Sequence, residues 1–73
     1  MSNTKCVLSY TDGYELSMRV FDSYDAAVKT IKDEYTRCAD NQLFSEDDSY
    51  LDETSAKCVI EGEDIFLWEL LVL

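Results

Sequence analysis

Carboxylates are the side chains whose number and spacing come closest to forming a chemical site in this sequence. Residues 46–48 read Glu-Asp-Asp, and Asp52 and Glu53 follow shortly after them. Paired carboxylates catalyse acid–base reactions when a cleft separates their pKa values, but a chain of 73 residues is too short to build such a cleft. The same oxygens suit calcium, yet their spacing does not match an EF-hand loop, so we expect only weak, adventitious binding.

One residue type and several motifs that many enzymes need are missing. The sequence has no His, which is the commonest general base and a frequent metal ligand. Its two glycines, Gly13 and Gly62, are both explained by expected turns, so no glycine-rich loop is left to cradle a phosphate. We therefore expect a protein that is not an enzyme, with no catalytic residue, no metal site and no cofactor.

Three cysteines, Cys6, Cys38 and Cys58, could meet in space as a redox or metal site. Each lies among apolar neighbours, where Cys usually packs as a small hydrophobic residue, and their spacing does not suit a disulfide framework. We expect free, buried thiols. The first five residues lack the apolar core of a signal peptide and no segment is long enough to span a membrane, so the expected location is cytoplasmic.

The net charge of −10 is concentrated in the second half of the chain. Residues 1–39 contain six acidic and five basic residues, a net charge of −1, whereas residues 40–73 contain ten acidic residues and only Lys57, a net charge of −9. A field of this sign repels nucleic acid and anionic membranes and attracts basic proteins. We therefore expect a basic protein partner, and no direct binding to nucleic acid or to a membrane.

Two segments before residue 40 show clear periodicity. Residues 4–10 and 14–20 alternate between polar and apolar side chains around Asp12-Gly13, a pair suited to a tight turn, so they predict a β-hairpin of half-buried strands. From residue 23 to residue 39 apolar side chains recur at steps of three and four, which predicts an amphipathic helix. Asp22 or Ser23 can cap its first turn.

The acidic connection over residues 40–54 is the expected functional surface. Its apolar residues Leu43, Phe44, Tyr50 and Leu51 are expected to pin it to the core, and a helical turn near residues 43–48 would make its length ordinary. Residues 55–61 and 65–73 then predict a second hairpin. The order ββαββ predicts an α+β fold, a four-stranded antiparallel sheet with one helix packed on one face, in a single domain spanning residues 1–73.

The last strand is apolar on both sides. Alternate residues from Phe66 to Val72 suit the side that faces the helix, and Val7 and Val59 can join the opposite side. Contiguous exposed apolar area marks an interface, so we expect the opposite side to be buried in a homodimer or against a partner. The alternative is a central strand that the acidic connection covers. The residues expected on the possible dimer face are Ile65, Leu67, Leu71 and Leu73.

The acidic half can also be interpreted as a nucleic-acid mimic. Duplex DNA carries a charge about every 1.7 Å along its axis, and a protein with a comparable array of carboxylates competes for a basic nucleic-acid-binding groove. Glu69 can add to that array, and Tyr50 is the candidate aromatic anchor within it. The residues expected to contact the partner are Asp40, Glu46, Asp47, Asp48, Tyr50, Asp52, Glu53, Glu61, Glu63 and Asp64.

In size, charge, missing catalytic residues and ββαββ order, the whole chain resembles the small acidic inhibitors encoded by phages and mobile elements. That class includes anti-CRISPR proteins, anti-restriction proteins and uracil-DNA glycosylase inhibitors. The resemblance implies inhibition in the host cytosol, without a cofactor, at the nucleic-acid-binding site of a Cas effector or another DNA-binding enzyme. The competing hypothesis is a small homodimeric adaptor or structural module that works through the apolar face of the last strand and uses its charge only for solubility.

Overall fold

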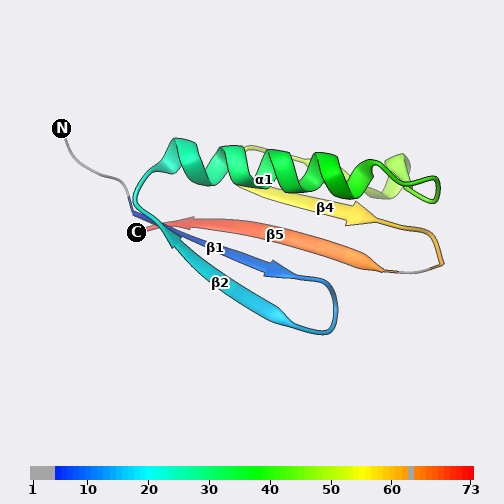
Figure 1. The fold of residues 1–73 in the computed structure, drawn as a ribbon, viewed down its shortest axis with the longest axis horizontal. Coiled ribbons are helices and arrows are strands. Elements are labelled where there is room, and N and C mark those ends of the chain that lie inside the picture. The colour runs from blue at the N-terminus through cyan, green and yellow to red at the C-terminus, as the bar shows by residue number, and fades with distance from the viewer. Residues whose placement is uncertain (1–4, 63) are drawn as a thin grey trace.

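The computed structural model describes residues 5–62 and 64–73, which form one antiparallel sheet with a helix across one of its faces (Figure 1). The strand order in the sheet is β2-β1-β5-β4-β3, so the last strand of the chain lies in the centre. The α+β class and the single-sided helix are confirmed for the described residues. The elements are β1 (Cys6–Thr11), β2 (Leu16–Phe21), α1 (Tyr24–Ala39), the 3₁₀ turn η1 (Glu46–Asp48), β3 (Tyr50–Leu51), β4 (Ser55–Val59) and β5 (Ile65–Val72).

The sheet has five strands in the described part of the chain, where four were predicted. The additional strand β3 is only two residues long, with Tyr50 opposite Lys57 and Leu51 opposite Ala56. A backbone hydrogen bond of 2.7 Å from Asp52 N to the Ser55 carbonyl closes the turn into β4. Tyr50 and Leu51 stand between runs of acidic residues and show no alternation that would indicate a strand. The prediction of four strands in the order ββαββ was therefore wrong at this edge of the sheet.

The β1–β2 hairpin is built around the predicted Asp12-Gly13 turn. The Asp12 carboxylate accepts from the backbone N–H groups of Tyr14 at 2.9 Å and Glu15 at 3.0 Å, and these bonds lower the Asp12 pKa. Gly13 has a φ of 95°, a conformation that costs residues with a Cβ atom steric energy. The turn therefore follows from the local sequence alone.

The helix α1 begins after Ser23, whose side chain caps it by accepting from Ala26 N at 3.3 Å. Ala27 and Ile31 are buried against the sheet, where the helix packs most closely over β4 and β5. Trp68 on β5 lies at the centre of this core. The fully or nearly fully buried apolar residues are Cys6, Leu8, Ala27, Ile31, Ala56, Cys58, Ile60, Trp68 and Leu70.

The register sorts every strand residue onto one of two faces, because directly opposed residues of antiparallel strands point to the same side. We call the side under α1 the covered face and the other side the open face. Leu16, Met18 and Val20 on β2 point to the open face and are 64%, 66% and 67% exposed. The predicted alternation of this strand is confirmed, but its half-burial is wrong, because no second layer covers its apolar side among the described residues.

No helix among the described residues has the length and apolar character that crossing a membrane requires.

Candidate functional site

Most of the predicted partner-contacting acids gather at one end of the molecule. Phe44 pairs with Ile60 in an isolated bridge, and backbone bonds of 2.8 Å run from Ser45 N to the Val59 carbonyl and from Glu61 N to the Leu43 carbonyl. These bonds hold the acidic connection alongside the end of β4. The acidic edge, as we define it, comprises Asp40, Glu46, Asp47, Asp48, Glu61 and Asp64, near the C-terminal end of α1 (Figure 1).

The remaining predicted contact residues lie elsewhere. Asp52 and Glu53 lie at the opposite end of the β3–β4 pair, about 20 Å from Glu61 at the usual rise per strand residue, and the Glu53 carboxylate accepts from the Tyr24 hydroxyl at 2.8 Å. Tyr50 points to the open face beside Lys57 rather than into the acidic edge. Glu63 lies outside the described residues.

Only one of the four apolar residues of the connection packs against the core. Phe44 is half-buried and meets Tyr35 edge-on, with ring centroids 6.1 Å apart. Leu43, Tyr50 and Leu51 are exposed, so the prediction that all four pin this segment to the core was wrong. Backbone pairing with β4 holds the connection instead.

The open face is a largely apolar surface across four strands, and Ser9, Glu69 and Ser55 form one polar row across it. Ile65, Leu67 and Leu71 on β5 are exposed, as predicted for the side away from the helix, and Leu73 beyond β5 is also exposed. The acidic connection does not cover them. Glu69 and Lys57 are the charged residues on this face within the described strands. Its apolar members are Val7, Leu16, Met18, Val20, Tyr50, Val59, Ile65, Leu67 and Leu71.

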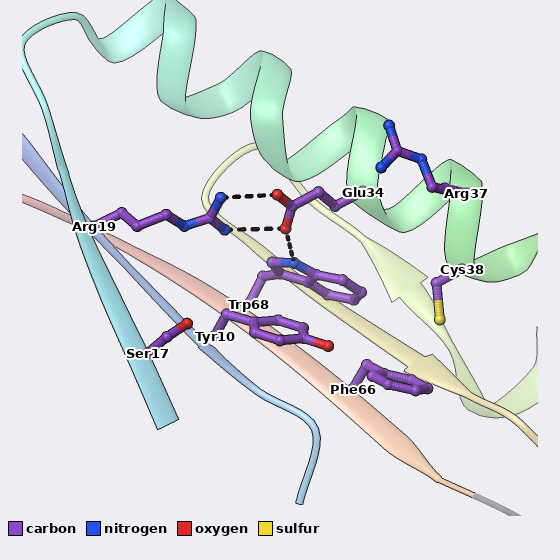
Figure 2. A pocket seen from close by; sticks show the side chains of 8 residues that line it. All are labelled: Tyr10, Ser17, Arg19, Glu34, Arg37, Cys38, Phe66 and Trp68. Carbon is purple, nitrogen blue, oxygen red and sulfur yellow. Dashed lines mark hydrogen bonds and ion pairs between the residues drawn. The ribbon is translucent and has the colours of Figure 1, made fainter. Parts of the chain in front are cut away.

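A groove on the covered side was not predicted. It lies between α1 and the β1–β2 hairpin, because the helix packs over β4 and β5 while the hairpin diverges from it (Figures 1 and 2). The cavity volume is about 580 Å³. We call it the aromatic groove; its lining residues are Tyr10, Ser17, Arg19, Glu34, Arg37, Cys38, Phe66 and Trp68.

A network of three hydrogen bonds closes one end of the aromatic groove (Figure 2). Arg19 on β2 donates to both Glu34 oxygens at 2.9 and 3.0 Å, and the Trp68 indole N–H donates to the same carboxylate at 2.9 Å. These donors hold the pKa of Glu34 below its usual range, and the carboxylate raises the pKa of Arg19. Through this carboxylate the network ties both the hairpin and β5 to the helix.

The prediction that the cysteines are buried is confirmed for two of the three, and none of them forms a disulfide among the described residues. Cys6 and Cys58 are buried and Cys38 is half-buried at the groove. Burial, followed by interaction with Cys58, raises the pKa of Cys38 to about 12, which keeps this thiol protonated at neutral pH. No cluster of three or more potential metal ligands occurs among the described residues.

One signal in the sequence could have revealed the aromatic groove. Arg19 follows the alternation of β2 onto the covered face, opposite Leu8, and a charged residue directed toward a core needs a partner. Glu34 lies on the side of α1 that reaches it, but periodicity alone does not fix how the helix crosses the sheet.

Comparison with protein-family models, with curated proteins and with solved structures finds no match to this chain.

Proposed function

We propose that this protein is a binding protein without an activity of its own, which works as a homodimer formed through the open face. The observation that carries the proposal is the set of exposed apolar side chains on β2 and β5, which half-buried Val7 on β1 and Val59 on β4 extend. An exposed apolar surface of this extent on a small domain is typical of an interaction site.

The size of the open face suits a stable interface. Strands about 4.8 Å apart with about 3.3 Å per residue give the four longer strands a projected area of about 400 Å². Protruding side chains make the accessible area larger than the projection, and stable complexes bury about 800 Å² on each partner. The open face is therefore of the order that a dimer needs.

The charges on the open face favour a second copy as the occupant. A two-fold interface must be complementary to itself. Lys57 on β4 and Glu69 on the neighbouring β5 give the face one cation and one anion, so a two-fold axis can set each opposite its counterpart in the other copy. The acidic edge lies at the end of the molecule, outside this surface, which limits repulsion between two chains of charge −10.

The dimer is tested by light scattering or sedimentation over a range of concentrations. We expect Leu67→Asp to produce monomers, whereas Leu51→Asp should leave the dimer intact. The two leucines are 41% and 39% exposed, but Leu51 pairs with Ala56 on the covered face, so the control accounts for the added charge. A wild-type chain that stays monomeric at high concentration, or equal behaviour of the two variants, would contradict the proposal.

The acidic edge favours a second function, inhibition of a basic nucleic-acid-binding protein as the class resemblance implies. Its six carboxylates lie together on a backbone fixed by the Phe44–Ile60 bridge. Residues 40–73 offer only Lys57 as a base, and Lys57 points to the open face. An array held in this way loses little conformational entropy on binding. A Cas effector or another DNA-binding enzyme remains the proposed kind of target.

The inhibitor function is tested with immobilised protein, cytosol and a salt gradient, and then with the purified bound protein and competing DNA. We expect moderate salt and DNA to release the partner, because the contact is electrostatic. Asp47→Lys with Asp48→Lys should abolish capture, and the matched control Glu15→Lys with Asp22→Lys should not. Salt should act oppositely on the dimer, since screening reduces repulsion between copies. Capture that resists both salt and DNA would count against the inhibitor function while leaving the dimer untouched.

A further inference from the structure

We propose that the aromatic groove binds a small planar aromatic molecule that carries a single carboxylate. This site lies on the covered side of the sheet and is independent of the open face and of the acidic edge. Its volume of about 580 Å³ falls within the range of small-molecule sites, about 300–1,000 Å³, and like them it is largely apolar with a few polar groups.

The floor of the aromatic groove is made of three rings. Tyr10, Phe66 and Trp68 form a triangle: the Tyr10 centroid lies 6.5 Å from Phe66 and 5.3 Å from Trp68, and those two lie 6.5 Å apart. Tyr10 is nearly parallel to Phe66, at an interplanar angle of 11°. The bond to Glu34 fixes the indole of Trp68. Rings held in place offer their faces to a planar ligand without a large cost in side-chain entropy. The floor therefore selects flat aromatic molecules.

Both arginines of the sequence line this groove, although the chain as a whole is strongly acidic. Arg19 is committed to Glu34 by two hydrogen bonds. Arg37 is exposed at the other side of the opening and makes no hydrogen bond or ion pair with any residue that the structure describes (Figure 2). The groove thus offers one guanidinium whose N–H groups have no acceptor among the described residues, within electrostatic range of Glu34 but not bonded to it, and such a group is a donor suited to a carboxylate.

The surrounding charges favour one negative charge over two. Asp40 and Asp64 line a smaller hollow that shares Arg37, Cys38 and Phe66 with the aromatic groove, and neither carboxylate pairs with Arg37. Together with the net charge of −10, they repel a dianion such as a phosphate monoester. A monoanionic carboxylate needs only one guanidinium as its partner, that of Arg37.

A hydroxyl donor completes the arrangement. The Tyr10 hydroxyl points into the groove and makes no hydrogen bond within residues 5–62 and 64–73 (Figure 2). Burial raises the pKa of Tyr10, so the hydroxyl stays protonated and can donate. A carboxylate near Arg37 with its ring over Tyr10 and Phe66 would satisfy both donors.

The test uses 2-naphthoate as the probe and neutral 2-naphthamide as its matched control, followed by ¹⁵N NMR of the full chain. Trp68 is the sole tryptophan, so its indole N–H gives one assigned signal at the groove. We expect naphthoate to shift this signal in a saturable way and naphthamide to shift it far less. Arg37→Gln should weaken naphthoate binding about tenfold, the usual scale for a lost charge-assisted hydrogen bond.

Lys32→Gln is the control for Arg37→Gln, because it removes the same charge from an exposed position on the same helix. It should change the affinity less than twofold. Equal binding of naphthoate and naphthamide, equal loss in the two variants, or shifts confined to the open face would each overturn the proposal. Leu67→Asp should leave naphthoate binding unchanged, so failure of the dimer and failure of this site are distinguishable.

Discussion

The covered and open faces belong to the same strands, but only the covered face packs against another element of the described chain. On the covered face, α1 buries Trp68 and Leu70, and the one charged residue that β2 directs inward, Arg19, finds Glu34 on the helix. On the open face, Leu67 and Leu71 of the same strand remain exposed. From Leu67 to Leu71, burial in β5 therefore follows the face to which each side chain points, and only beyond Leu71 does the strand end leave both faces exposed.

The two faces also differ in the kind of apolar residue that they use. Tyr10, Phe66 and Trp68 all point to the covered face, where rings pack against each other beside a helix. The open face is mainly aliphatic, with Tyr50 at its edge. Flat aliphatic surfaces suit sheet-on-sheet packing about 10 Å apart, which is how two copies would meet.

The largest expected effect compares neighbouring leucines of β5. Leu70→Ala should lower the free energy of unfolding by about 2–5 kcal/mol, since Leu70 is 7% exposed and its removal leaves a cavity. Leu71→Ala should lower it by less than about 1 kcal/mol in dilute solution, because exposed side chains contribute little to folding. Urea denaturation at low protein concentration measures both. Similar losses in the two variants would show that the open face is covered within a single chain.

Much of this contrast could be predicted from the sequence. Apolar residues at both odd and even positions over residues 65–73 predicted two apolar faces, and the Asp12-Gly13 turn and the Ser23 cap are local features with clear sequence signals. In β2, the alternation of apolar and polar residues predicted a strand but not which side the helix would cover, because period-two patterning does not identify the packing layer.

The features that the sequence did not predict depend on tertiary contacts. The strand β3 exists because β4 supplies hydrogen-bonding partners for Tyr50 and Leu51, not because these residues form a pattern. Likewise, the aromatic groove depends on the path of α1 over β4 and β5, which no local signal determines. The acidic edge was partly predicted: Asp47 and Glu61 do lie at one end, whereas Asp52 and Glu53 extend toward the other.

A smaller effect is expected from breaking the bond network at the edge of the covered face. Glu34→Ala should cost about 2 kcal/mol, because it leaves the Arg19 guanidinium and the Trp68 indole N–H without their acceptor. The matched control Asp33→Ala removes an exposed contact to Lys29 at 3.2 Å and should cost less than about 0.5 kcal/mol. Thermal or urea unfolding measures both, and equal losses would mean that the network contributes nothing beyond a surface ion pair.

The smallest effect isolates the charge of Glu34 through its pH dependence. Glu34→Gln keeps an oxygen that can accept from Trp68, so it should cost only about 1 kcal/mol at neutral pH, a value reduced by the partial exposure of Arg19. Because the folded-state pKa of Glu34 is lowered, its contribution is fully present above the ordinary carboxyl pKa and is lost as the pH falls through the lowered value. The difference in unfolding free energy between wild type and Glu34→Gln should therefore shrink toward zero in acid. The other carboxylates, including Asp12, are present in both chains, so their contributions to the pH dependence of stability cancel in this difference. A difference that stays constant from neutral to acid pH would show that the shape of the Glu34 side chain, and not its charge, stabilises the covered face.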